Sequence, residues 1–291
     1  WEDTGLAENN FASPSLEDIL QTIEQLKPIP QTALKIFRMF KSGMGGITDI
    51  AHELGKDQVL SGQVLKVCNS ALFSGTGRVD SLKDAVLLMG EDMLIKSVVT
   101  AAVNNYYGQT GTSGYSLCRG GLFFHAVGVA AMADQIAVKS GTVQPKLAYT
   151  AGLLHDIGKV ILDQFVAEAS PLFFRNLSLE SHSFIDTEKK LLGISHAEAG
   201  SLLARKWKFS DSLNQVIRFH HNPSEAEAHH NLVFTIYLAD LIIEKFSSGF
   251  DLEKMKTDYL ETALTHLGLD VDVLPELVDT IPVKAFSLGE W

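Results

Sequence analysis

Apolar residues recur at helical spacing along most of this sequence, and this periodicity limits the folds that it can adopt. One such stripe consists of Leu16, Ile19, Leu20, Ile23 and Leu26. No segment shows the sustained alternation of apolar and polar residues that is typical of a half-buried strand. The sequence therefore predicts an all-α fold in which successive helices bury one face each.

A glycine-rich stretch divides the helical pattern. Residues 108–121 hold five glycines together with Ser, Thr and Gln, which is typical of a linker. The predicted organisation is a frayed N-terminal segment, an N-terminal helical subdomain, this linker, a second helical subdomain and a C-terminal helical extension, at residues 1–14, 15–107, 108–121, 122–247 and 248–291.

Charge and composition exclude several classes of function. The net charge is −11, and Lys and Arg form no block or stripe, which argues against nonspecific binding to nucleic acid or to an anionic membrane. No uninterrupted apolar run reaches the roughly 20 residues that span a bilayer, and residues 1–14 lack the pattern of a signal peptide. Cys68 and Cys118 are far apart and predict reduced thiols. We therefore expect a cytoplasmic protein without a membrane partner.

Residues 47–69 hold a pattern that resembles a DNA-binding motif. Two short helices are predicted at Ile47–Leu54 and Gln58–Asn69 with Gly55 between them, as in a helix-turn-helix. The second helix carries only Lys66 as a cation, whereas a helix that reads a groove normally presents several polar and basic side chains. A DNA-binding regulator is therefore the weakest of the functions considered.

The most informative stretch runs from Ala151 to Lys159. An apolar run that belongs in a protein interior ends in the adjacent side chains of His155 and Asp156, followed by Gly158 and Lys159. Burying a neutral polar group without a partner costs roughly 2 to 7 kcal/mol, and an unpaired charge costs far more. The pair therefore predicts a compensating partner, and a metal ion is the leading candidate.

Other histidines and a further carboxylate are also predicted to face the protein interior. His125, His220 and Asp240 each lie on the apolar stripe of a different helix, and His196 falls in the first turn of a helix that Ser195 and Glu198 cap. A lone histidine on such a face is more often a hydrogen-bonded core residue, and we interpret His52, His182, His229, His230 and His266 as surface or core histidines.

A set of imidazoles and carboxylates converging from separate helices needs a cation to stay buried. Mixed His and carboxylate ligands favour one or two transition-metal ions, iron, manganese, zinc or nickel, over calcium or magnesium. Adjacent His220 and His221 project about 100 degrees apart on a helix, so they either serve two metals or leave one ring outside the shell. The predicted ligands are His125, His155, Asp156, His196, His220, His221 and Asp240.

The order of these residues resembles the HD superfamily of metal-dependent phosphohydrolases. His125, the His155-Asp156 pair and Asp240 match its core pattern, and His196 with His220-His221 resembles the longer ligand set of the HD-GYP phosphodiesterases. In those relatives two or three metals activate a water for attack on a phosphodiester, and the lysine at the position of Lys159 contacts phosphate. Asn222 and Pro223 follow the histidine pair without a Gly-Tyr-Pro segment, which argues against cyclic di-GMP hydrolysis.

The sequence is also similar, over roughly residues 15–245, to the HDOD domain, an HD-related output domain of bacterial signalling proteins. The motifs that carry this resemblance are Leu26-Lys27-Pro28-Ile29-Pro30, Cys68-Asn69-Ser70-Ala71 within residues 64–73, residues 84–90, Gly152 to Lys159, residues 196–200, Trp207, and His220-His221-Asn222-Pro223. The resemblance implies an all-α HDOD architecture with an HD-type helical bundle. HDOD members commonly resemble degenerate HD domains without an established catalytic activity, whereas this sequence keeps a near-complete ligand set.

Two functions follow from the resemblance. The leading one is a bacterial signalling or regulatory module with a metal centre in its second half and other signalling proteins as partners. The alternative is a metal-dependent phosphohydrolase or phosphodiesterase acting on a nucleotide or cyclic nucleotide, with Asp156 and Lys159 as its catalytic residues. Nucleic acid is not an expected partner in either case.

Overall fold

All regular secondary structure in the described part of the chain is helical, as the sequence predicts. The computed structural model describes residues 13–41, 46–69, 79–108, 110, 114–116, 120–179, 183–247 and 257–281, and contains no strand within these ranges. Most of segment 1–14, the end of the Cys68 motif at residues 70–73, and Cys118 lie outside the described residues.

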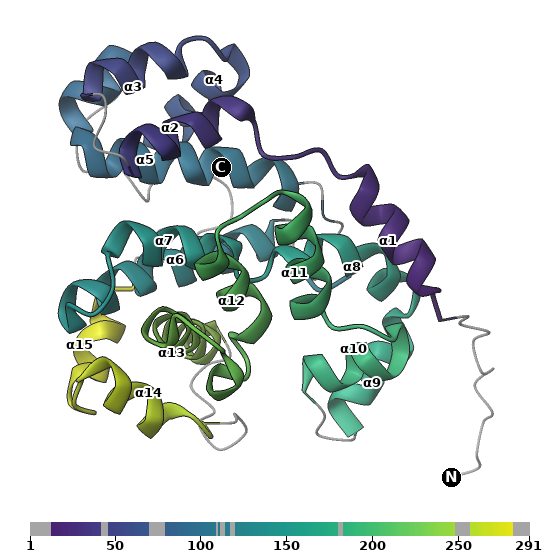
Figure 1. Cartoon of the computed structure of the whole chain (residues 1–291). Coiled ribbons are helices and arrows are strands. Elements are labelled where there is room, and N and C mark those ends of the chain that lie inside the picture. Colours follow the sequence, from purple (N-terminus) through teal and green to yellow (C-terminus); the bar gives the residue numbers. More distant parts are fainter. Residues whose placement is uncertain are drawn as a thin grey trace, which may run out of the picture.

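In the described residues, five helices precede the glycine-rich stretch (Figure 1). They are α1 (Leu16–Gln25), α2 (Gln31–Lys41), α3 (Ile47–Leu54), α4 (Gln58–Cys68) and α5 (Leu82–Tyr107). Helix α5 contains a break at Gly90, whose φ of 68° lies in the left-handed region that favours glycine. Gly90 therefore interrupts an otherwise continuous run of helix.

Ten further helices follow it in the described residues, together with one short 3-10 helix, η2. They are α6 (Gly121–Ser140), α7 (Pro145–Leu154), α8 (Ile157–Glu168), α9 (Ser170–Leu179), α10 (Phe184–Leu192), α11 (His196–Lys206), α12 (Asp211–Phe219), η2 (Pro223–Glu225), α13 (His230–Ser247), α14 (Leu260–Leu267) and α15 (Val273–Asp279). The apolar run of residues 147–162 is thus divided between α7 and α8, and His155 and Asp156 form the junction.

Capping residues set the helix starts that matter most for the site. The Ser195 side chain accepts a hydrogen bond from the backbone of Glu198, and the Glu198 carboxylate accepts one from the backbone of Ser195 at 3.0 Å. This capping box satisfies two amide groups at the start of α11. It confirms the predicted start of this helix and places His196 in its first turn.

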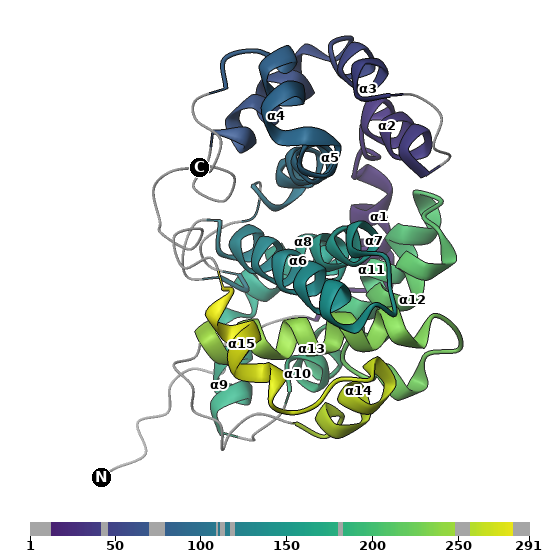
Figure 2. The same ribbon diagram turned by 90° about the vertical axis from the view of Figure 1, so that its left-hand side faces the viewer.

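Helices α2 to α5 form a layer on one side of the molecule, and α6, α7 and α8 lie beneath it (Figures 1 and 2). Helix α13 packs against the opposite side of α6, α12 and α14 pack against α13, and α15 packs against α6. One buried apolar cluster contains residues from α1 to α5 as well as from α6, α7, α8 and α11. A second cluster joins α6 and α7 to α12, α13, α14 and α15.

Two close helix contacts depend on glycine. A Cβ atom on Gly152 of α7 would lie 2.6 Å from the Cα of Ala130 in α6. A Cβ atom on Gly158 of α8 would lie 1.8 Å from the backbone oxygen of His196 in α11. Only a residue without a side chain lets these backbones approach so closely, and both contacts adjoin the His155-Asp156 junction.

Helix α5 connects the first layer to the helices beneath it through polar contacts. Lys96 pairs with Asp134 of α6 at 2.7 Å, and the hydroxyl groups of Thr100 and Tyr149 lie 2.9 Å apart. The Tyr107 hydroxyl donates to the backbone oxygen of Leu153 at 3.3 Å, two residues before His155. The first layer is therefore packed directly against the helices that carry the predicted ligands.

Helix α6 is long and apolar enough to cross a membrane by length and composition. In the structure, 67% of its most apolar window is buried by other parts of the protein. This burial identifies α6 as a core helix of the fold.

Candidate metal centre

The seven residues predicted as metal ligands come together at the centre of the second half of the chain. They fall into two groups, within each of which the candidate ligand atoms lie within 4.8 Å of one another. One group consists of His125 from α6, His155 at the end of α7 and Asp240 from α13. The other consists of Asp156 before α8, His196 from α11, and His220 and His221 after α12.

Asp156 lies between the two groups and offers one oxygen to each. Its Oδ1 is 3.2 Å from the Nε2 of His196 and 3.5 Å from the Nε2 of His220. Its Oδ2 is 3.3 Å from the Nε2 of His155 and 3.5 Å from the Nε2 of His125. Because the side chain is 1% exposed, the carboxylate is held between these rings and can bridge two cations.

On the Oδ2 side, two imidazoles face two carboxylates. The Asp240 Oδ1 is 3.0 Å from the Nε2 of His125 and 3.7 Å from the Nε2 of His155. We call the set of His125, His155, Asp240 and the Oδ2 of Asp156 the Asp240 site. It offers two nitrogen and two oxygen atoms, a set that suits several first-row transition metals.

On the Oδ1 side, three imidazoles face one carboxylate. The Nε2 of His196 lies 3.4 Å from that of His220 and 3.0 Å from that of His221. We call His196, His220, His221 and the Oδ1 of Asp156 the three-histidine site. The rings of the adjacent His220 and His221 therefore lie on the same side of Asp156, whereas their spacing predicted either two metals or one ring outside the shell.

Hydrogen bonds on the far side of three rings aim their Nε2 atoms at the centre. The Nδ1 of His155 donates to the backbone oxygen of Gly152 at 2.7 Å, and the Nδ1 of His220 donates to that of Ile217 at 3.1 Å. The Nδ1 of His196 donates to Glu188 at 2.7 Å. A carbonyl oxygen only accepts, so the first two contacts require a proton on Nδ1 and leave Nε2 free for a metal.

Four buried atoms at the centre of this arrangement have no hydrogen-bond partner. They are the Nε2 atoms of His125 and His155 and the Oδ1 atoms of Asp156 and Asp240. Each unsatisfied buried group costs about 1 to 3 kcal/mol, more if it is charged. A cation that bonds to the nitrogens and neutralises the carboxylates removes this cost, so the residues present fit a metal centre.

The charges of the cluster shift the pKa values of its members in opposite directions. Burial alone would lower the pKa of His155, but Asp156 and Asp240 outweigh it and raise this pKa to about 10. Burial and the positive charges of His220 and His196 hold the pKa of His221 well below its usual range. Burial opposes ionisation of Asp240, yet His125 and His155 hold its pKa well below the usual value. Both carboxylates of the centre therefore stay ionised near neutral pH, as metal ligands must.

Lys159 adjoins the centre on the Oδ2 side of Asp156. Its Nζ lies 2.5 Å from that oxygen and faces the rings of Tyr115 and Phe184, at 5.8 Å and 5.7 Å from their centroids. Burial would lower its pKa, but Asp156 and Asp240 raise it above the usual value. The ammonium group is therefore kept charged beside the candidate ligands, where it can bind an anion such as phosphate.

Three residues near the centre were not predicted from the sequence. Glu188 of α10 is fully buried and accepts the hydrogen bond of His196, and Tyr115 donates to Glu188 at 2.6 Å. Glu244 lies one turn after Asp240 on α13, and burial together with the charge of Asp240 raises its pKa to about 8. Glu188 precedes the buried Leu191 and Leu192 by three and four residues, a spacing that could have placed it on the inner face of α10.

The histidines interpreted as surface or core residues lie apart from the two sites. His52, His229, His230 and His266 are exposed, and His182 lies outside the described residues. His229 lies 3.4 Å from Asp211, and His266 stacks on Phe234. Neither contact belongs to the candidate metal centre.

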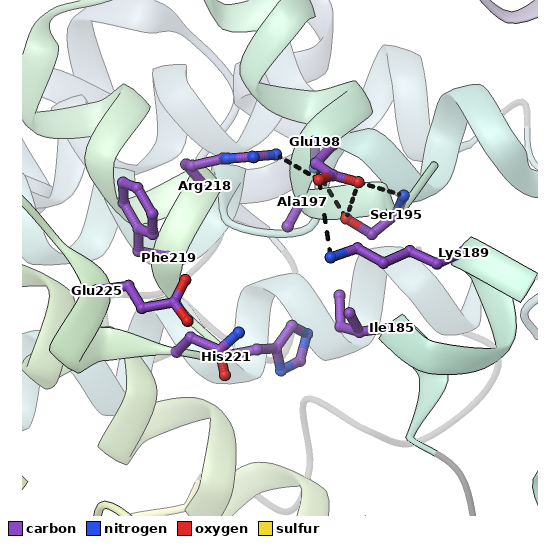
Figure 3. A pocket seen from close by; sticks show the side chains of 10 residues that line it. Ile185, Lys189, Ser195, Ala197, Glu198, Arg218, Phe219, His221 and Glu225 are labelled. Atoms are coloured by element: carbon purple, nitrogen blue, oxygen red, sulfur yellow. Dashed lines mark hydrogen bonds and ion pairs between the residues drawn. The ribbon is translucent and has the colours of Figure 1, made fainter. Parts of the chain in front are cut away.

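A small pocket reaches the centre at His221 (Figure 3). Lys189 and Arg218 line it, and both point to Glu198, with nitrogen to oxygen distances of 3.7 Å and 3.2 Å. Glu225 lines its other side. The pocket thus combines basic and acidic groups beside a partly exposed member of the three-histidine site.

Comparison with known proteins places most of the chain in one family. The sequence profile of the HDOD domain matches residues 26–223. An uncharacterized protein of Treponema pallidum (strain Nichols) is 27% identical in an alignment of 243 positions that covers 79% of this chain and 44% of that protein. The chain therefore spans less than half the length of this relative.

Solved structures share the fold over nearly the whole chain. An HDOD domain protein with unknown function from Geobacter sulfurreducens has a TM-score of 0.77 at 25% identity, covering 94% of this chain and 99% of that one. A candidate phosphohydrolase from Shewanella amazonensis SB2B has a TM-score of 0.70 at 24% identity, covering 92% and 96%. A candidate signal transduction protein from Marinobacter aquaeolei VT8 has a TM-score of 0.72 at 23% identity, covering 94% and 64%. The last two likenesses concern the fold alone.

Proposed function

The chain belongs to the HDOD domain family, and from this premise we propose that it is a bacterial signalling module whose second half binds two metal ions. One observation carries the proposal: seven candidate ligands lie in two groups on the two sides of Asp156, with four buried atoms that make no hydrogen bond. A cluster of this kind is costly to bury without a cation.

The donor atoms support one ion in each site. The Asp240 site has two imidazole nitrogens and two carboxylate oxygens, and the three-histidine site has three nitrogens and one oxygen. Four donors satisfy a tetrahedral ion, or leave open positions on an ion with five or six ligands. Zinc, iron, manganese and nickel all fit such donors, and calcium and magnesium prefer oxygen-only ligands.

Contacts between the layers support a role in signalling. Tyr107 of α5 bonds to the backbone beside His155, and Lys96 of α5 pairs with Asp134 of α6, the helix that carries His125. Metal binding that shifts α6 or α7 therefore acts directly on the first layer. We propose that this layer presents the surface that other signalling proteins bind, and that metal occupancy controls that surface.

A phosphohydrolase is the second candidate, favoured by the position of Lys159 and by the pocket at His221. Bound metal ions would supply an activated water and a clamp for phosphoryl oxygens. Lys159, held against Asp156 at 2.5 Å, is placed to bind the negative charge of a phosphate. Lys189 and Arg218 line the approach to His221 and are placed to bind further anionic groups of a nucleotide or cyclic nucleotide.

Elemental analysis tests the metal proposal. Protein purified after expression in metal-supplemented medium is expected to carry close to two transition-metal ions per chain, and Asp156→Ala is expected to lose both. Asp134→Asn is the matched control, because Asp134 is a buried carboxylate paired with Lys96 outside the centre. Less than about a tenth of an equivalent of any transition metal in the unaltered protein would reject the proposal.

Turnover of nucleotides, cyclic dinucleotides and generic phosphodiesters separates the two functions. Metal-loaded protein that hydrolyses none of them supports the signalling module and rejects the enzyme. Hydrolysis that Lys159→Ala and Asp156→Ala both abolish, and that Asp134→Asn retains, favours the enzyme instead.

A further inference from the structure

Tyr115 is not a candidate ligand, yet it contacts both the lysine and the histidine network of the centre. Its ring centroid lies 5.8 Å from the Nζ of Lys159, and its hydroxyl donates to the Oε1 of Glu188 at 2.6 Å. Burial and the charge of Glu188 raise its pKa well above the usual value, so the hydroxyl keeps its proton and remains a donor. Tyr115 comes from the stretch between α5 and α6 that the sequence predicts as a linker.

Glu188 connects Tyr115 to His196. The carboxylate is fully buried and accepts from the Tyr115 hydroxyl, from the Nδ1 of His196 at 2.7 Å, and from the backbone nitrogen of His196 at 2.7 Å. These bonds fix both the ring and the backbone of His196 at the start of α11. The Nε2 of His196 is thereby directed to the three-histidine site.

Residues 114–116 are docked on α8 rather than free of it. The backbone nitrogen of Tyr115 donates to the Oδ1 of Asp163 at 3.0 Å. A Cβ atom on Gly114 would lie 2.1 Å from the same oxygen and 2.6 Å from the Asp163 backbone oxygen. The segment therefore fits against α8 only with glycine at position 114, and this contact sets where Tyr115 lies.

We propose that Tyr115 is a positioning residue of the metal centre, which acts through Glu188 to hold His196 in the orientation that the three-histidine site requires. The inference rests on the proposed function, because it presumes an ion bound at that site. It makes residues 114–116, which lie between the two halves of the chain, part of the surroundings of the metal centre. A displacement of this segment weakens the ion on one side of Asp156 and spares the ion at the Asp240 site.

The physical basis is the loss of one of the hydrogen bonds that hold a buried carboxylate. Without the Tyr115 hydroxyl, Glu188 keeps its bonds to His196 but gains freedom to rotate, and the imidazole follows it. Removing a partner behind a metal ligand typically weakens metal binding about 10-fold to 100-fold. We expect a loss near the lower end for Tyr115→Phe and near the upper end for Glu188→Gln, which removes the charge.

The experiment is a titration of metal-free protein with Co²⁺, in which visible absorption reports the ligand geometry of each ion. Unaltered protein is expected to bind two ions. Tyr115→Phe is expected to bind one ion with unchanged affinity and the other about 10-fold more weakly, with an altered spectrum for the weaker ion. His196→Ala identifies that ion, because it should lose the same spectral component.

Tyr149→Phe is the matched control. Tyr149 is buried, whereas Tyr115 is partly buried, and the replacement of Tyr149 also removes one side-chain hydrogen bond, to Thr100 at 2.9 Å, but outside the metal centre. Gly114→Ala is a second test that leaves Tyr115 in the sequence and displaces the segment from Asp163. It should weaken the same ion as Tyr115→Phe.

The outcomes separate the two proposals. If unaltered protein binds two ions and Tyr115→Phe titrates like Tyr149→Phe, the role of Tyr115 is rejected and the metal centre stands. If Tyr115→Phe weakens both ions equally, the role is also rejected, because a general loss of folding explains the result. If unaltered protein binds no ion, the proposed function fails, and this inference fails with it.

Discussion

The two sites on either side of Asp156 differ in donor atoms and in surroundings. In the Asp240 site, the carboxylate of Asp240 faces His125 and His155. The charged Lys159 pairs with the Oδ2 of Asp156, which belongs to the same site. The three-histidine site has Asp156 as its carboxylate among three imidazoles. Among these rings, His196 is held by the buried Glu188, which accepts from both its Nδ1 and its backbone nitrogen.

The difference indicates that the two sites of one cluster should prefer different metal ions and exchange them at different rates. More oxygen donors and more negative charge favour harder ions such as manganese or ferrous iron at the Asp240 site, and a nitrogen-rich set favours zinc or nickel at the three-histidine site. His221 of the latter site lines the pocket, which gives solvent a route to that site, and each site includes one partly exposed histidine. Exchange with metal ions in solution should therefore be faster there.

Replacing Asp156 should remove the distinction altogether and has the largest expected effect. Asp156→Ala deletes an oxygen from both sites and leaves the Lys159 ammonium without its 2.5 Å partner. We expect both affinities to fall by at least about 100-fold. Isothermal titration with Zn²⁺ measures the loss, and Asp134→Asn should retain both ions. Retention of either ion at its original affinity would show that Asp156 is no bridge.

Single histidine replacements should separate the two sites. His125→Ala removes a nitrogen of the Asp240 site, and His196→Ala removes one from the three-histidine site. Each variant should carry one ion per chain, because the other four donors are intact. Metal counting after dialysis checks this, and the double variant should carry none. Loss of both ions from either single variant would mean that the two sites bind as one unit.

Gly158→Ala should weaken metal binding at the three-histidine site alone, because it displaces the backbone of His196. The added Cβ atom would meet the His196 backbone oxygen at 1.8 Å, so α8 and α11 must separate. Overpacking of this kind costs about 1 to 3 kcal/mol of stability, and the shift of His196 should weaken the three-histidine ion about 10-fold to 100-fold. Thermal unfolding with and without Zn²⁺ measures both effects. Gly193→Ala, where a Cβ atom would meet no atom within 4 Å, is the control for stability alone, with strain from its φ of 76°.

The release of protons on metal binding should also differ between the two sites. In metal-free protein Asp156 and Asp240 raise the pKa of His155 to about 10 against the effect of burial, so this ring is protonated at neutral pH. Metal needs the neutral ring. The affinity of the Asp240 site should therefore rise with pH up to about 10 by as much as about tenfold per unit, instead of levelling near 6.5. At the three-histidine site, burial lowers the pKa of His221 and that of His220, whereas Glu188 and Asp156 raise the pKa of His196 against the effect of burial. His196 is therefore the ring of that site from which proton release is expected.

Titration calorimetry in buffers of different ionisation enthalpy counts the released protons. The raised pKa of His155 also stabilises the metal-free fold. This contribution is fully present below the usual pKa of 6.5 and is lost as the pH rises through about 10. Metal binding to the Asp240 site without proton release at neutral pH would contradict the assignment of His155 as a charged ring.

Much of this arrangement was open to prediction because it follows from local patterns. Helical periodicity gave the fold class, and the capping box at Ser195 gave the start of α11. His125, His220 and Asp240 were assigned to the interior because each shares a face with apolar neighbours. The geometry brings all seven predicted ligands together, and metal binding by them stays a prediction.

The residues behind the ligands were harder to predict. Glu188 precedes Lys189 and Lys190, and such a run of charges is normally a solvent-exposed face, although Glu188 is fully buried. Tyr115 lies among glycines, and its place is set by Asp163, 48 residues later in the chain. Contacts of this range depend on how α8 and α10 pack, which periodicity does not encode.

Anomalous diffraction from crystals grown with Zn²⁺ or Mn²⁺ tests the central claim most directly. We expect two peaks, one bonded to Asp240 and the Oδ2 of Asp156, the other bonded to His196, His220, His221 and the Oδ1 of Asp156. Data that show no anomalous peak within bonding distance of these atoms, from crystals soaked at saturating metal, would contradict it.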